Sequence, residues 1–194
     1  MKRPAWIVIA LIAVSLAAVA LVRRCDRSDG LSRAPAPTLR MRSLRNMTYQ
    51  SEATNAGWVR LTDGKFEDAP GHVWVTLLDN VAWGDVTGDG RADAAVVLAT
   101  NFGGSGVYHS LAVVTDVDGV PVNLSVAELG DRIKLTGLAI ENETIVVEMV
   151  TQGPSDPMCC PTKNVTRVYG VEGEELRLIE QIPPEPAPSE EPQD

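Results

Sequence analysis

The chain has 194 residues, of which 17 are Lys or Arg and 26 are Asp or Glu, so its formal net charge is −9. An apolar fraction of 44% is enough for the core of one medium-sized domain. The charge is unevenly spread: residues 23–45 carry seven Arg against two Asp, whereas residues 46–182 carry 8 basic and 20 acidic groups. Because a phosphate backbone is bound by a basic face, this acidic body excludes general nucleic-acid binding.

The first segment is an uncharged apolar run from Pro4 to Val22 that follows two basic residues. Its length suits either a secretory signal peptide or a helical signal anchor, so we predict one of these over residues 1–22. The triplet ending at Ala20 is compatible with cleavage there, while the Arg23-Arg24 pair beyond it favours retention. If the segment is uncleaved, residues 4–22 form a membrane contact. The residues before Cys25 do not suit a lipidation site.

The next segment, residues 23–45, is rich in Arg, Ser and Pro and is predicted to be a basic flexible tether. Taken alone, its Arg cluster would keep the body in the cytoplasm by the positive-inside rule. The calcium-type loop and the cysteines described below fit an exported body better. We therefore predict a bacterial cell-envelope protein, anchored in the inner membrane or secreted, with its body facing the periplasm or the exterior. Residues 183–194 are predicted to be a disordered Pro/Glu-rich tail.

The body, residues 46–182, is predicted to be all-β, because short β-branched runs alternate with turn residues and no stretch has a helical period. The expected strands lie near 58–62, 73–83, 93–100, 107–116, 121–129, 132–140, 144–151, 164–171 and 175–181. Tight hairpin connections are expected at 62–65, 117–120, 141–143 and 172–174. Such a chain makes an antiparallel meander that forms a small curled sheet, a sandwich or a partly open barrel, preceded by the N-terminal apolar helix. Residues 94–99 are apolar on both faces and predict a central strand.

One loop of the body carries a metal-ligand pattern. Residues 85–93 read DVTGDGRAD, with oxygen-bearing side chains at the first, third, fifth and ninth positions. Calcium takes about six to eight oxygen ligands, and this spacing can supply three carboxylates, a hydroxyl and a backbone carbonyl. The predicted ligands of a structural Ca²⁺ are Asp85, Thr87, Asp89, the carbonyl of Arg91, and Asp93. The alternative is an acidic, Gly-rich turn that binds nothing.

The same loop resembles the strand–loop–strand calcium sites of FG-GAP/VCBS-type repeats, which implies a Ca²⁺ that stabilises the fold. One such loop cannot make the propeller in which those repeats occur. A wider set of segments resembles a family of uncharacterised bacterial exported and lipoprotein-type β domains: VAWGDVTGDGRADAAVVLA, GGSGVYHSLAVV, LGDRIKL and VTQGPSDPMCCPT. This second resemblance spans roughly residues 58–180, and it implies an envelope location and a shared β fold but no activity.

A second loop, residues 153–161, is stiffened by three prolines and contains adjacent cysteines. We predict that it is a partner-contact or redox-sensitive surface, with these residues at its centre: Pro154, Pro157, Met158 and Pro161. Cys159 and Cys160 can form a vicinal disulfide, stay as two packed thiols, bind a soft metal together with Met158, or pair with Cys25. The sequence leaves these alternatives open.

The sequence contains few groups suited to catalysis. Ser105 lies four residues before His109, but a hydrolase elbow joins a strand to a helix, and this Gly-rich run is expected to join two strands. The sequence therefore predicts a non-enzymatic cell-envelope domain that is stabilised by one calcium ion. The alternative is an inhibitor or binding module for a basic envelope partner, because an acidic body attracts and steers a basic protein.

Overall fold

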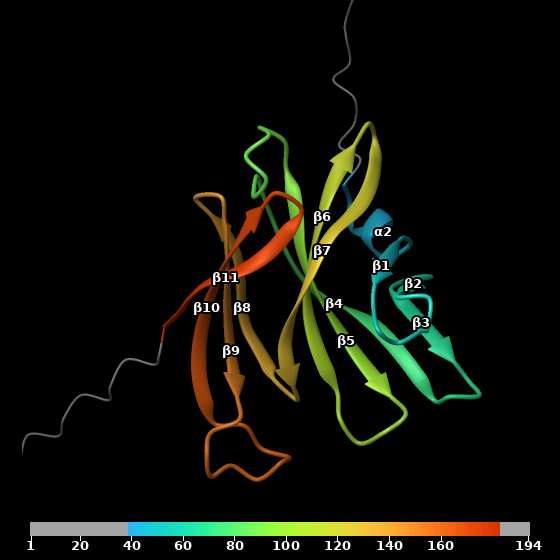
Figure 1. Cartoon of the computed structure of the whole chain (residues 1–194), viewed down its shortest axis with the longest axis vertical. Coiled ribbons are helices and arrows are strands. Elements are labelled where there is room, and N and C mark those ends of the chain that lie inside the picture. Colours follow the sequence, from blue (N-terminus) through green and yellow to red (C-terminus); the bar gives the residue numbers. More distant parts are fainter. Residues whose placement is uncertain (1–38, 183–194) are drawn as a thin grey trace, which may run out of the picture. The chain divides into compact units, whose positions relative to one another are not determined.

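The structure is a computed structural model of the chain, and it describes residues 39–182 (Figure 1). The predicted apolar helix of residues 1–22, most of the predicted tether and the predicted tail lie outside the described residues. Within residues 39–182, no helix is both long enough and apolar enough to cross a membrane. The described part is all-β apart from the short helix α2 (Met41–Leu44), which confirms the predicted fold class.

The larger sheet has five antiparallel strands in the order β3-β4-β5-β6-β7. Register shifts, which are typical of β-bulges, interrupt the pairing of β4 with β5 and of β6 with β7. Since bulges increase local twist, they account for the curled, half-barrel form of the sheet in Figure 1. The strands are β3 (Lys65–Asp68), β4 (Val73–Gly84), β5 (Asp93–Phe102), β6 (Tyr108–Val117) and β7 (Val120–Asp131).

The second sheet has four antiparallel strands in the order β11-β10-β9-β8. They are β8 (Lys134–Glu141), β9 (Thr144–Thr151), β10 (Lys163–Glu172) and β11 (Glu175–Ile182). Two-residue turns join β8 to β9 and β10 to β11, and another joins β6 to β7 in the larger sheet. Asp118 and Asn142 adopt positive φ values of 52° and 49° in these turns, as tight hairpins require. These three connections confirm the hairpins predicted at 117–120, 141–143 and 172–174. The turn predicted at 62–65 closes only an isolated bridge between Thr62 and Lys65, because β2 pairs with β1 and β3 with β4.

A smaller N-terminal element consists of α2 and a two-stranded sheet, β1 (Thr48–Gln50) paired with β2 (Trp58–Arg60). The buried hydroxyl of Tyr49 donates a hydrogen bond of 2.8 Å to the carbonyl of Leu44, which ties β1 to α2. Burial raises the pKa of this phenol well above its ordinary value, so the hydroxyl keeps its proton. Strands β1 and β3 are short and were not predicted, because three or four residues do not establish an alternating pattern.

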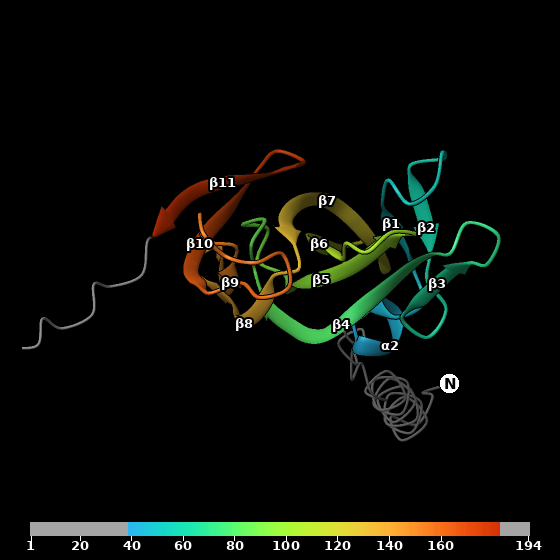
Figure 2. The same cartoon turned by 90° about the horizontal axis from the view of Figure 1, so that it is seen from below.

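Strand β5 separates two hydrophobic cores, and all but the last of its residues are buried. Residues 95 and 97 face a core shared with the four-stranded sheet, whereas residues 94, 96 and 98 face a core shared with α2, β1 and β2. Because side chains alternate along a strand, the five-stranded sheet is covered on opposite faces by these two elements (Figure 2). The apolar run of residues 94–99 therefore forms a central strand, as predicted.

The two covering elements meet the sheet at different places. Gly84 at the end of β4 packs so closely on β8 that a Cβ atom there would lie 2.6 Å from Cγ2 of Ile140. On the other face, the backbone amide of Gln50 donates to the side-chain carbonyl of Asn123 on β7, at 2.8 Å. These contacts position the loop after β4 and the open end of the core shared with α2, β1 and β2. These are the two candidate functional regions.

Candidate functional site

The predicted calcium loop connects β4 to β5, and Gly84 and Asp93 are paired at its base. The loop thus lies between two antiparallel strands, in the strand–loop–strand arrangement that the sequence predicts. Gly88 and Gly90 have φ values of 74° and 80°, a backbone region in which a side chain is disfavoured. These two glycines let the chain reverse direction within the loop.

Asp93 is fully buried and organises the loop from the first position of β5. One of its carboxylate oxygens, Oδ2, accepts hydrogen bonds of 3.0 Å from the backbone amides of Val86 and Thr87 and from the Thr87 hydroxyl. The other oxygen, Oδ1, is buried and has no hydrogen-bond partner within residues 39–182. A buried carboxylate oxygen without a donor is costly, and a bound cation would remove that cost.

Asp85 holds the middle of the loop through both of its carboxylate oxygens. The amide of Gly88 donates to Oδ1 at 2.7 Å, and the amide of Gly90 donates to Oδ2 at 2.8 Å. Each oxygen of an ionised carboxylate has more than one lone pair, so these bonds leave acceptor capacity for a metal. The geometry of Asp85 is therefore compatible with the predicted ligand role.

Asp89 is instead turned toward Arg91. The Arg91 guanidinium donates to Asp89 Oδ2 from Nε at 2.9 Å and from Nη2 at 2.6 Å, and this pairing lowers the pKa of the Asp89 carboxyl. The same guanidinium lies 3.9 Å from Asp116 at the end of β6. To act as a calcium ligand, Asp89 would have to exchange Arg91 for the ion. Both groups of this pair lie near the surface, where such an exchange is inexpensive.

The three predicted carboxylates thus converge on one loop but do not form a closed cluster. Within the described residues, no group of three or more His, Cys, Asp or Glu side chains is gathered closely enough to hold a metal ion. A fourth carboxylate does approach the loop: a Cβ atom at Gly88 would lie 3.9 Å from Oε2 of Glu143. Sequence reasoning missed Glu143, because it belongs to the turn between β8 and β9 and no local motif connects it to the loop.

The proline-rich loop connects β9 to β10 and is held by Asp156. The carboxylate of Asp156 accepts hydrogen bonds of 2.7 Å from the amides of Gly153 and Thr162 and one of 2.9 Å from the Thr162 hydroxyl. Hydrogen bonds from these donors lower the pKa of the Asp156 carboxyl, and the Gly153 amide makes the largest contribution. Asp156 therefore acts as a clamp that closes the loop at its base.

The tip of this loop is exposed and carries the adjacent cysteines. The sulfur atoms of Cys159 and Cys160 lie within bonding distance of each other, as in a vicinal disulfide. Met158 is 69% exposed, and its carbonyl accepts hydrogen bonds from Arg132 and Gln152. Of the residues predicted to contact a partner, Pro154 and Pro157 are also exposed, whereas Pro161 is buried and anchors the loop.

The glycine run at residues 103–106 joins β5 to β6, so it connects two strands as predicted. Ser105 accepts a long hydrogen bond of 3.4 Å from Arg132 rather than contacting a base. His109 lies on β6 with its Nδ1 atom buried and without a partner within residues 39–182, and burial lowers its pKa. The structure gives no hydrogen bond between Ser105 and His109 among the described residues.

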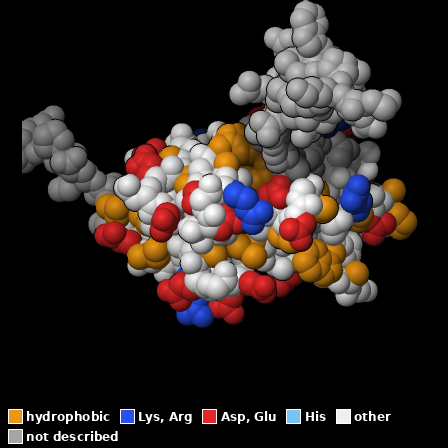
Figure 3. All heavy atoms as spheres, turned by 90° about the horizontal axis from the view of Figure 1, so that it is seen from above, with side chains coloured by type: hydrophobic (Ala, Val, Ile, Leu, Met, Phe, Trp, Pro, Cys, Tyr) orange, Lys and Arg blue, Asp and Glu red, His pale blue; other side chains and the backbone are white. Residues whose placement is uncertain are grey.

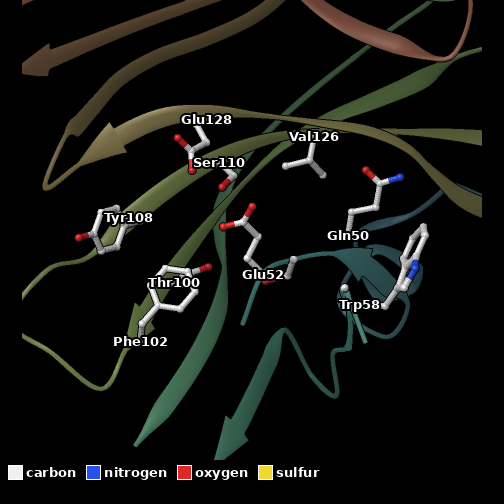
Figure 4. Close-up of a pocket in the computed structure, with 11 residues that line it drawn as sticks. Gln50, Glu52, Trp58, Thr100, Phe102, Tyr108, Ser110, Val126 and Glu128 are labelled. Carbon is white, nitrogen blue, oxygen red and sulfur yellow. The ribbon is translucent and has the colours of Figure 1, made fainter. Parts of the chain in front are cut away.

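A groove lies at the open end of the core shared by β5 with α2, β1 and β2 (Figure 4). It has a volume of about 420 Å³ and is formed by β5, β6 and β7 together with the segment from Gln50 to Trp58. Three of its side chains are aromatic and exposed: Trp58, Phe102 and Tyr108. Two glutamates, Glu52 and Glu128, also line it. Sequence reasoning missed this groove, because its residues come from strands that only the sheet register brings together.

Comparisons with protein-family models, with curated proteins and with solved structures find no match to this chain.

Proposed function

We propose that the protein is a non-enzymatic domain of the bacterial cell envelope, stabilised by one Ca²⁺ in the loop of residues 85–93. The observation that carries the calcium proposal is the buried Oδ1 atom of Asp93, which has no hydrogen-bond partner within residues 39–182. The same carboxylate is fixed through Oδ2 by three donors of the loop, so Oδ1 is held in one place. An oriented, desolvated carboxylate oxygen is a favourable ligand for a hard cation.

The remaining ligands would come from the same loop. Asp85 and the carbonyl of Arg91 would contribute from opposite sides of the turn, Thr87 would add its hydroxyl, and Asp89 would join after releasing Arg91. Glu143, whose Oε2 atom would lie 3.9 Å from a Cβ atom built at Gly88, would add a further ligand from the β8–β9 turn. A calcium ion would therefore link the five-stranded sheet to the four-stranded sheet, which supports a stabilising role.

The test is thermal unfolding of the full chain, in detergent, with calcium or with EDTA. Calcium at about 100 times its dissociation constant should stabilise the fold by about 2.7 kcal/mol and raise the melting temperature. Asp85→Asn and Asp93→Asn should abolish that rise. Asp118→Asn, which removes an exposed carboxylate from the neighbouring β6–β7 turn, should leave it intact. An equal melting temperature with calcium and EDTA, or a rise that survives Asp93→Asn, would refute the proposal.

A second candidate function is a binding module for a basic envelope partner. The groove favours it, because its lining contains two glutamates and no lysine or arginine. On the face in Figure 3, acidic side chains are also more frequent than basic ones. Attraction between opposite charges speeds association and falls with ionic strength. Complex formation with a basic envelope protein should therefore weaken as salt is raised, and a yield that ignores salt would count against this function.

A further inference from the structure

The groove lies where one face of the five-stranded sheet extends beyond the N-terminal element that covers it. On β5, residues 94, 96 and 98 are buried under the N-terminal element, and the same face continues to Thr100 and Phe102. The register places Thr100 opposite Tyr108 on β6, and Ser110 opposite Glu128 on β7. The sheet therefore extends past its cover, and its last side chains point into the groove (Figure 4).

Aromatic side chains stand at the two ends of the groove. Phe102 and Tyr108 form an edge-to-face pair with ring centroids 5.4 Å apart and an interplanar angle of 61°. Trp58 lies at the other end, on β2 (Figure 4). Their exposed fractions are 45%, 44% and 47%, respectively, which is high for large apolar rings. Clustered exposed aromatic rings are typical of binding sites, since they offer large and rigid contact areas.

The charged groups between the rings are two carboxylates. Figure 4 shows the carboxylates of Glu52 and Glu128 directed toward the space around Ser110. None of these three side chains makes a hydrogen bond or ion pair with another of the residues 39–182. With no lysine or arginine in the lining, the two negative charges have no counter-charge within the groove. Glu52 and Glu128 are both exposed, and a cation that can also lie against an aromatic ring would complement them.

We infer that the groove binds an arginine side chain presented by a basic polypeptide partner, which deepens the binding-module candidate and rests on it. A guanidinium group is planar, so it stacks on an aromatic face, and its five N–H groups can bind two carboxylates and a hydroxyl at once. The ammonium group of lysine lacks the plane and the fixed fork of donors. The groove combines both kinds of contact, with rings at its ends and carboxylates between them.

The placement of the rings favours a polypeptide over a small cation. The groove opens on the surface between the five-stranded sheet and the segment from Gln50 to Trp58. Its aromatic groups flank the carboxylates rather than enclosing them (Figure 4). An extended segment can place an arginine between Glu52 and Glu128 and lay its neighbouring residues on Trp58 and Tyr108. A small polyamine could reach the carboxylates but would leave the outer rings uncovered.

The experiment measures fluorescence anisotropy of a fluorescein-labelled Arg-Gly repeat peptide with the full chain in non-ionic detergent and saturating calcium. Glu52→Gln combined with Glu128→Gln should weaken binding about tenfold or more. Glu174→Gln combined with Glu180→Gln is the matched control, because it removes the same charge from exposed positions on and beside β11. Trp58→Ala should weaken binding several-fold at unchanged net charge. The affinity of the control should stay within about twofold of that of the unsubstituted chain.

Four results would overturn the inference. Equal weakening by both glutamate pairs would show attraction to the whole acidic body rather than to the groove. Equal affinity for a Lys-Gly repeat peptide would show that the groove does not select arginine over lysine. Displacement of the peptide by spermidine at matched charge would show that the groove does not require a polypeptide. Tighter peptide binding after Arg→Gln substitution of Arg23, Arg24, Arg27 and Arg33 would show that the chain's own basic segment fills the groove. These readouts do not depend on the calcium-induced melting shift, so either proposal can fail alone.

Discussion

Asp93 and Thr87 are joined twice: the backbone amide and the side-chain hydroxyl of Thr87 both donate to Oδ2 of Asp93, each at 3.0 Å. The two residues are six positions apart in sequence, and the two bonds close the β4–β5 loop on the first residue of a buried strand. The carboxylate that closes the loop is also the one that leaves a buried oxygen without a partner among the described residues. Closure of the loop and the proposed binding of calcium therefore depend on the same side chain.

Asp93→Ala should destabilise the calcium-free fold by about 2–4 kcal/mol, because it leaves the buried amide of Val86 and the partly buried amide of Thr87 without an acceptor. Thr87→Val removes only the hydroxyl bond and should cost about 1 kcal/mol. Urea unfolding in EDTA gives both values. Equal costs for the two variants would contradict the account of the loop.

Glu143→Gln should reduce calcium affinity, since it removes the charge of a carboxylate that approaches the loop from the four-stranded sheet. We expect about a tenfold loss, measured by calorimetric titration of calcium into the full chain. Glu141→Gln, in the same hairpin but at the end of β8, is the control and should bind as the unsubstituted chain does. Unchanged affinity in Glu143→Gln would exclude this residue as a ligand.

Gly84→Ala should destabilise the fold by about 1–3 kcal/mol, because the added Cβ would overlap Ile140, at 2.6 Å from its Cγ2 atom. Gly104→Ala is the matched control: a Cβ there meets nothing within 4 Å, so little change is expected. Combining Gly84→Ala with Ile140→Ala should recover part of the loss as a non-additive term in a double-mutant cycle. Strictly additive costs would mean that the two residues do not meet.

The Asp156 clamp should open in acid. Its folded-state pKa lies below the ordinary value, because the Gly153 amide and then the Thr162 side chain and amide donate to the carboxylate. The clamp therefore stabilises the loop above the ordinary carboxyl pKa, and this contribution is lost as the pH falls through the lower folded-state pKa. The Gly153 and Thr162 amide signals should titrate together in NMR with that lowered midpoint, and Asp156→Asn should abolish the transition. A midpoint at or above the ordinary value would refute the clamp.

The adjacent cysteines should be found as a disulfide in protein purified without reductant. A peptide that contains Cys159 and Cys160 should then be lighter than its reduced form by the mass of two hydrogens, and reduction should restore that mass. Chemical labelling before reduction should leave both thiols unmodified. Two labelled thiols in the unreduced protein would contradict the vicinal bond, and a Cys25-linked peptide would show a different pairing.

The fold was predictable where patterns were local. The β-branched runs of β6 and β9, the doubly apolar run of β5 and the Asp118-Gly119 turn each depend on neighbouring residues, and each was predicted correctly. The short strands β1 and β3 were missed, because they show no clear pattern of their own. They are recognised as strands only through their pairing with β2 and β4.

The two candidate functional regions also differ in how far local sequence could predict them. The calcium-type loop is contiguous, so its residues could be named from spacing alone, although the turn of Asp89 toward Arg91 could not. Glu143 reaches that loop only through the packing of β8 on Gly84. The groove joins Glu52, Ser110 and Glu128 through register across three elements, and no sequence motif marks it.

In both of the larger sheets, every strand is paired only with strands that immediately precede or follow it along the chain. Such nearest-neighbour order needs little loop closure, so each hairpin can form soon after its second strand is made. A chain that leaves a ribosome or a narrow pore N-terminus first can therefore assemble the five-stranded sheet before β8 emerges. The strands most prone to mispairing would then be covered early, which reduces the time in which unpaired edges can aggregate.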